Sequence, residues 1–308
     1  MAAADIVKEP GIEETGFASL FVTAPDGLRL HVRRYGERGR GLPIMCLPGL
    51  TRNGTDFHEL ATSLTRDAAQ PRLVFTIDSR GRGGSGYDPN AENYSFPVEL
   101  ADVLAVITAL EIGPAIFVGT SRGGILTMLL GAARPTAIAG AILNDIGPVI
   151  DVKGLVRIKG YAGKLPTPRS YEEGAEILRR LGDAQFPGLS PESWLRQAKQ
   201  VWRQQNGAMV LAYDPNLSKT LETIDVERPP PALWVQFDSL ARVPLMVVHG
   251  ANSDILSAAT LDAMRERRLD IDILEVPNQG HAPLLVEPDV IARIAAFVTL
   301  CDVSALGF

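Results

Sequence analysis

The sequence contains little cysteine and little histidine. Its 308 residues include two cysteines, Cys46 and Cys301, and four histidines. Two cysteines are too few for the disulfide framework of a small secreted domain. No histidine stands near a cysteine at the spacing of a zinc site. The sequence therefore excludes a disulfide scaffold and a zinc finger, and we expect both thiols to be buried and reduced.

Long hydrophobic runs and an excess of positive charge are also absent. No apolar run reaches the roughly 18 residues that a membrane helix requires. The first residues lack the basic stretch and apolar core of a signal peptide. The net charge of -6 does not favour binding to nucleic acid or to an anionic membrane. We therefore expect a cytoplasmic protein that binds a small-molecule substrate, no nucleic acid and no membrane; its oligomeric state stays open.

Short apolar segments alternate with helical segments along most of the chain. The apolar segments are rich in Val and Ile, as strands buried on both faces should be. Strands are expected at residues 17–23, 28–35, 42–47, 72–77, 115–118, 138–143, 244–249 and 271–276. Helices are expected at residues 56–66, 97–110, 121–133, 258–268 and 285–300. This alternation predicts an α/β fold with a doubly wound, mostly parallel sheet.

The alternation stops after Pro148 and resumes at Pro244. The segments between them are helical and rich in proline, and no strand is predicted there. We expect a core of residues 17–148 and 241–308, a helical cap insertion at 149–240 and an N-terminal extension at 1–16. The first helix of the insertion carries four basic residues and no acid: Lys153, Arg157, Lys159 and Lys164. Such a helix either attracts a carboxylate-bearing substrate or presents a solvated face.

A candidate nucleophile lies in the segment Gly119-Thr120-Ser121-Arg122-Gly123. This is a G-x-S-x-G pattern between an expected strand and an expected helix, which is the context of a nucleophile elbow. The tight turn requires small residues around the serine. It raises the hydroxyl above the sheet, beside the positive end of the helix dipole. We therefore predict that Ser121 is the nucleophile.

A serine nucleophile requires a base and an acid that orients the base. His281 follows the expected strand 271–276, and Asp254 follows the expected strand 244–249. Both lie on loops at the sheet edge that carries Ser121, in the chain order Ser, Asp, His. Asp145, which follows the strand 138–143, is a competing candidate for the acid. We prefer Asp254 and keep Asp145 as the alternative.

Acyl transfer also requires hydrogen-bond donors for the developing oxyanion. The backbone amide of Arg122, directly after the nucleophile, is one expected donor. The loop after the strand 42–47 supplies the other, because Gly49 lets the backbone approach and Leu50 then offers its amide. We predict an oxyanion hole formed by the amides of Leu50 and Arg122.

Five segments together resemble the α/β-hydrolase superfamily: Leu47-Pro48-Gly49, Asp78-x-Arg80-Gly81-x-Gly83-x-Ser85, Gly119-x-Ser121-x-Gly123, Gly250-x-x-x-Asp254 and Gly280-His281. The chain is most similar to the capped branch that holds esterases, lactonases, carbon–carbon bond hydrolases and cofactor-free haloperoxidases. Pro48 departs from the His-Gly that commonly begins the oxyanion motif. Because the donors are backbone amides, the hole is still expected. A serine at position 121 argues against dehalogenases and epoxide hydrolases, which use aspartate.

The resemblance implies hydrolysis of a small or medium carboxylic ester or lactone through an acyl-serine intermediate. It implies no metal and no organic cofactor. We expect Tyr161, Trp202 and Trp234 of the insertion to line the substrate pocket. Carbon–carbon bond hydrolysis, perhydrolysis and acyl transfer use the same triad and remain alternatives. A ligand receptor on a hydrolase scaffold is a further alternative, because a fold does not fix a function.

Overall fold

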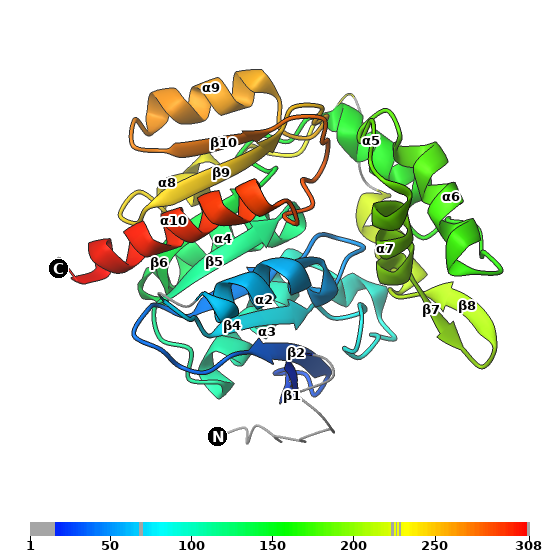
Figure 1. Cartoon of the computed structure of the whole chain (residues 1–308), viewed down its shortest axis with the longest axis horizontal. Coiled ribbons are helices and arrows are strands. Elements are labelled where there is room, and N and C mark those ends of the chain that lie inside the picture. Colours follow the sequence, from blue (N-terminus) through cyan, green and yellow to red (C-terminus); the bar gives the residue numbers. More distant parts are fainter. Residues whose placement is uncertain (1–15, 68–69, 223–224, 226, 228, 307–308) are drawn as a thin grey trace.

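The computed structural model describes residues 16–67, 70–222, 225, 227 and 229–306. Its centre is an eight-stranded sheet in the order β1-β2-β4-β3-β5-β6-β9-β10 (Figure 1). The first two strands are antiparallel to their neighbours, and the other six run parallel. The strands span Ala18–Thr23, Arg29–Tyr35, Val74–Asp78, Ile44–Leu47, Ala115–Thr120, Ile138–Asn144, Leu245–Gly250 and Asp272–Val276 in that sheet order. The predicted α/β fold is confirmed.

Helices cover both faces of the sheet. One face packs on α2 (His58–Arg66) and α10 (Pro288–Leu306). The other face packs on α3 (Phe96–Ala109), α4 (Arg122–Ala133) and α9 (Ala258–Arg267). Alternate side chains of each central strand enter opposite cores: in β5, Phe117 lies on one side and Val118 on the other. This two-sided burial explains why the strands are continuously apolar instead of alternating with polar residues.

The segment between β6 and β9 forms a separate group of elements, which we call the cap (Figure 1). The cap contains α5 (Val152–Tyr161), α6 (Tyr171–Gly182), α7 (Pro191–Val201), β7 (Trp202–Gln205), β8 (Ala208–Leu211) and the 3-10 helix η4 (Pro215–Leu221). A small apolar cluster around Trp202 and Tyr213 joins its elements, and Tyr94 of the main core also belongs to this cluster. The last helix of the predicted insertion, α8 (Trp234–Asp238), instead packs on α4 of the main core.

The cap contains a β-hairpin that the sequence analysis missed. Strands β7 and β8 pair antiparallel, with Gln205 opposite Ala208. Their two connecting residues, Asn206 and Gly207, have φ values of 51° and 79°. Two positive φ angles in an Asn-Gly pair are the signature of a type I′ hairpin turn. This dipeptide was the signal that predicts the hairpin, and the helical character of the flanking segments obscured it.

The structure also bears on membrane insertion. Within the described ranges, none of the helices combines the length and the apolar character that crossing a bilayer requires.

Candidate active site

Ser121 sits in a strained turn between β5 and α4. Its backbone has φ 51° and ψ −114°, a conformation that residues other than glycine rarely adopt. The flanking glycines make the turn possible. A Cβ on Gly119 would lie 2.5 Å from the carbonyl oxygen of Gly123, and a Cβ on Gly123 would lie 2.0 Å from that of Leu47. The turn has the backbone geometry expected of a nucleophile elbow, and its strain lies at the serine itself.

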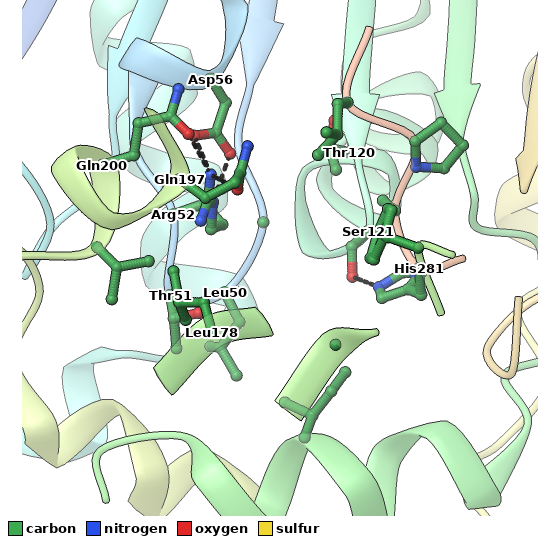
Figure 2. Close-up of a pocket in the computed structure, with 18 of the residues that line it drawn as sticks. Leu50, Thr51, Arg52, Asp56, Thr120, Ser121, Leu178, Gln197, Gln200 and His281 are labelled. Atoms are coloured by element: carbon green, nitrogen blue, oxygen red, sulfur yellow. Dashed lines mark hydrogen bonds and ion pairs between the residues drawn. The ribbon is translucent and has the colours of Figure 1, made fainter. Parts of the chain in front are cut away.

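Three side chains form a continuous hydrogen-bonded chain at the carboxyl edge of the sheet. Ser121 Oγ lies 2.8 Å from His281 Nε2. Figure 2 marks this contact with a dashed line. His281 Nδ1 lies 2.8 Å from Oδ2 of Asp145, the residue that follows β6. Asp145 also accepts hydrogen bonds from the amide of Gly250 (3.0 Å) and the hydroxyl of Ser253 (2.6 Å). The geometry is that of a serine–histidine–acid triad.

The carboxyl group of Asp145 is suited to remain ionised. Burial acts to raise its pKa, but hydrogen bonds from His249 and His281 outweigh burial and hold the pKa below its usual range. A carboxylate that stays charged at neutral pH can orient the imidazole and stabilise its protonated form.

The structure corrects the predicted acid. Asp254 does not contact His281; its two carboxylate oxygens pair with Arg157 of α5 at 2.6 and 2.8 Å. The backbone carbonyl of Asp254 also accepts the amide of Gly154 at 3.0 Å. The loop after β9 thus turns Ser253 toward the triad and Asp254 toward the cap. Asp145 takes the acid position because β6 lies next to β5 in the sheet.

Two further residues hold the triad, and the sequence analysis assigned neither a role there. His249, on β9, places Nδ1 3.3 Å from Asp145 Oδ1 and is buried. Gln185, in the cap between α6 and α7, accepts the backbone amide of His281 through Oε1 at 2.9 Å. No local pattern marks Gln185, because its role depends on how the cap docks on the His281 loop.

The expected oxyanion donors lie beside the nucleophile. Within the described part of the chain, the amides of Leu50 and Arg122 donate to no protein acceptor. A Cβ on Gly49 would lie 3.8 Å from Cβ of Ser121, so the loop after β3 approaches the nucleophile closely. Two free amides close to a serine hydroxyl are what an oxyanion hole requires.

A cavity of about 200 Å³ opens above the nucleophile, between the sheet edge and the cap. Ser121, His281 and Leu50 form its floor. The cap contributes much of its apolar wall: Leu178, Leu181, Phe186, Leu189 and Trp194. The loop after His281 contributes Leu284, Leu285 and Val286. Tyr161 of α5 also lines it, as predicted, and burial raises the pKa of its phenol. The cavity has the mixture of apolar wall and few polar groups that is typical of small-ligand sites.

Comparisons with known proteins agree with this geometry. The model of the alpha/beta hydrolase family matches residues 44–294. The chain belongs to the α/β-hydrolase family. It is 32% identical over 286 residues to a 3-hydroxybutyrate-oligomer hydrolase of Cupriavidus necator, covering 90% of this chain and 95% of that protein.

Solved structures give the same answer. A crystal structure of an α/β hydrolase from Novosphingobium aromaticivorans superposes with a TM-score of 0.85 at 37% sequence identity. That match covers 92% of this chain and 99% of the other.

A more distant sequence relative, the 2-(acetamidomethylene)succinate hydrolase of Mesorhizobium japonicum, is 22% identical over 264 residues, covering 85% of this chain and 88% of that protein. The chain is thus an α/β-hydrolase enzyme, and the similarity covers most of its length.

Two of the predicted pocket residues of this α/β-hydrolase lie elsewhere. Trp202 is fully buried in the core of the cap, where its ring packs beside Gly174. Trp234, in α8, stacks edge-on against Phe237 and lies under the guanidinium of Arg267. Neither tryptophan lines the cavity. Aromatic residues of a cap serve its packing as readily as its pocket, so composition alone does not separate the two roles.

One end of the α/β-hydrolase cavity is polar. Arg52 lies there, held by three acceptor side chains: Asp56, Gln197 and Gln200. Figure 2 shows this group across the cavity from Ser121 and His281. All four bonds use Nε or Nη2 of Arg52, so among the described residues Nη1 has no protein acceptor. This nitrogen is available to a ligand oxygen.

Proposed function

We propose that this α/β-hydrolase cleaves a carboxylic ester through an acyl-serine intermediate. The observation that carries the proposal is the unbroken chain Ser121 Oγ–His281–Asp145, with both contacts at 2.8 Å. A serine is a weak nucleophile unless a positioned base removes its proton, and this arrangement supplies that base.

The proposed reaction proceeds in two halves. Ser121 Oγ attacks the ester carbonyl carbon while His281 Nε2 takes its proton, and the amides of Leu50 and Arg122 bind the oxyanion. The C–O bond then breaks, and His281 returns the proton to the leaving alcohol. A water molecule attacks the acyl-serine by the same route and releases the acid. Asp145 stays ionised throughout and fixes the imidazole by accepting its Nδ1–H.

The proposed substrate is a small or medium ester that carries a second oxygen group, such as an ester of a hydroxy acid. The cavity of about 200 Å³ suits a short acyl group, and its far end offers Arg52 to an additional oxygen. The relative that acts on 3-hydroxybutyrate oligomers supports this class, because such oligomers repeat ester carbonyls along a short chain.

Replacement of Ser121 by alanine tests the reaction. Ser121→Ala is expected to lower turnover of p-nitrophenyl butyrate by roughly 10⁴-fold or more, because no other group provides the nucleophile. It should also abolish labelling by a fluorophosphonate, measured by intact-protein mass spectrometry. The control is Ser304→Ala, which removes a hydroxyl on α10 that donates to the carbonyl of Leu300 and should leave labelling intact. A Ser121→Ala protein that is labelled at the wild-type rate would refute the assignment.

The substrate class needs a separate experiment. Rates should be compared for the linear dimer of 3-hydroxybutyrate, its methyl ester, and p-nitrophenyl esters of two to twelve carbons. The expected order places the hydroxy-acid esters and short acyl chains above the long chains, since a cavity of about 200 Å³ is small for a dodecanoyl group. A preference for the twelve-carbon ester would contradict the proposed class.

A further inference from the structure

A buried ion cluster lies directly behind the two proposed oxyanion donors. Its centre is Glu99 on α3, which is 1% exposed. One carboxylate oxygen accepts Nη1 of Arg82 and the other accepts Nε of Arg122, each at 2.6 Å. The triad does not use these residues, and the sequence analysis assigned Glu99 no role.

Each arginine connects Glu99 to one of the two segments that carry the proposed oxyanion donors. Arg82 donates through Nε to the backbone carbonyl of Leu50 at 2.7 Å. Arg122 is itself the residue whose amide follows the nucleophile, and its Nη2 donates to the carbonyl of Tyr94 at 2.9 Å. One carboxylate therefore connects the loop after β3 to the start of α4, two segments that are about 70 residues apart in sequence.

Burial of these charges costs desolvation free energy, so stability alone does not explain the cluster. Burial acts to raise the pKa of Glu99, but the two guanidinium groups outweigh it and keep the carboxyl ionised. Burial and the nearby charge of Arg122 lower the pKa of Arg82. Apolar side chains of similar volume commonly stabilise a core as well as a buried ion group does. Charged groups add control over geometry, because each charge-assisted hydrogen bond fixes the position of one particular partner.

We propose that Glu99 is a positioning residue for the oxyanion hole, which sets the spacing of the Leu50 and Arg122 amides through Arg82 and Arg122. The proposal rests on the proposed function, because it assumes that these amides stabilise an oxyanion. Donors aimed at the developing charge lower the barrier only when they are held in place before the reaction. Glu99 does not touch the substrate, so its effect is confined to the step in which the oxyanion forms.

Glu99→Gln separates positioning from a through-space charge effect. The amide keeps the size of the side chain but donates at one end, so it cannot accept from both arginines. Removal of a negative charge near the hole would strengthen oxyanion binding if charge alone mattered. Loss of positioning instead predicts a kcat about 10- to 100-fold lower with KM within about twofold, less than the loss of a whole donor. Affinity for a trifluoromethyl ketone, which forms a serine-bound oxyanion, should fall by a similar factor.

The matched control is Asp102→Asn, one turn further along α3. Asp102 is also buried and pairs with one arginine, Arg80, at 2.6 and 2.7 Å. The side chain of Arg80 otherwise binds Asp26 and Asp88, and these carboxylates lie outside the oxyanion loops. Its backbone carbonyl accepts Nη1 of Arg82 at 2.6 Å, a bond that Asp102→Asn does not remove. Both variants should lower the melting temperature, but at a temperature where both are folded only Glu99→Gln should lose kcat and inhibitor affinity.

The outcomes are distinct. If folded Glu99→Gln keeps the wild-type kcat and inhibitor affinity, or if Asp102→Asn loses as much, the positioning role is wrong while the esterase function stands. If the wild-type enzyme shows neither ester turnover nor fluorophosphonate labelling, the proposed function fails and this proposal fails with it. Should Glu99→Gln not fold, Arg82→Lys provides the same test. Lysine keeps the charge but cannot reach both Glu99 and Leu50 with a rigid fork, so kcat should again fall with little change in KM.

Discussion

The surroundings of Asp145 fix both the orientation and the ionisation of its carboxylate. It accepts from His281, His249, Ser253 and the amide of Gly250, so donors from β9, its following loop and the His281 loop converge on it. A carboxylate with this many donors is held in a single orientation and stays ionised. The corresponding position after β9, Asp254, is engaged by Arg157 and faces the cap.

Paired substitutions distinguish the two acids. Asp145→Asn should lower kcat on the order of 10³- to 10⁴-fold, because an amide no longer selects the productive tautomer of His281. Asp254→Asn should change kcat by less than about threefold, since it loses only a partly exposed ion pair with Arg157. Steady-state kinetics on p-nitrophenyl butyrate measure both. A large loss in Asp254→Asn with an active Asp145→Asn would restore the sequence-based assignment.

The proposed substrate class gives Arg52 a role in the choice among esters rather than in the breaking of the bond. Arg52→Lys keeps a charge beside Asp56 but loses Nη1, the terminal nitrogen for which the described residues provide no acceptor. KM for the methyl ester of the 3-hydroxybutyrate dimer should rise roughly tenfold, the magnitude expected for one hydrogen bond to a charged group. p-Nitrophenyl acetate carries no second oxygen group on its acyl side and serves as the control substrate. Equal changes for both esters would show that Arg52 does not bind the substrate.

At the level of elements, the cap is fixed to the core at several separate points. The amide of Gly83 donates to the carbonyl of Ala212 at 2.8 Å, and the amide of Asp214 donates to that of Gly81 at 2.7 Å. On the far side, Gln185 holds the His281 loop. These bonds place the cap over the nucleophile, so that α6 forms a wall of the cavity instead of a loose cover.

A bulkier side chain on α6 should therefore narrow the cavity. Leu178 lines the cavity and is labelled in Figure 2. Leu178→Trp is expected to lower kcat/KM for p-nitrophenyl hexanoate at least tenfold and to leave that for p-nitrophenyl acetate within about twofold, because only the longer acyl group meets the new ring. Leu195→Trp, also on a cap helix but not lining the cavity, is the control. If Leu178→Trp affects both esters equally, α6 does not select the acyl chain.

Over the whole molecule, buried carboxylates make the free energy of unfolding depend on pH. Asp78, Glu99 and Asp145 are buried, and in each case neighbouring cations or hydrogen bonds outweigh burial and lower the pKa. A lowered folded-state pKa contributes stability above the unfolded value of about 4, and that stability is lost as the pH falls. Asp102 has the opposite sign, because burial raises its pKa, and it offsets part of the effect.

The net expectation is a protein that unfolds more easily in acid. The free energy of unfolding can be measured by urea titration. The contribution of these carboxylates should change little between pH 7 and pH 6, and it should decrease when the pH is lowered below about 5. Glu99→Gln should show a shallower fall than the wild type, since it removes one of the three groups. A free energy of unfolding that stays constant or rises on acidification would contradict this account.

The sequence by itself determined the sheet and the positions of Ser121 and His281 at its carboxyl edge. Val- and Ile-rich segments separated by amphipathic helices specify a doubly wound sheet, because each signal is local and repeated. Ser121 between two glycines, at a strand-to-helix junction, defines the elbow for the same reason. His281 follows from its position after the last strand. The N-terminal extension expected at residues 1–16 falls outside the described residues except for Gly16.

Only the tertiary structure decided which acid faces the histidine, which aromatic residues line the cavity, and what lies behind the proposed oxyanion donors. Asp145 and Asp254 both follow a strand at the same sheet edge, and their roles differ because Ser253 and Gly250 turn to one while Arg157 captures the other. Glu99 stands inside an ordinary helical segment, and its two partners come from distant loops. Side-chain partners across such sequence distances are set by the packing of whole elements, which leaves no mark in a local pattern.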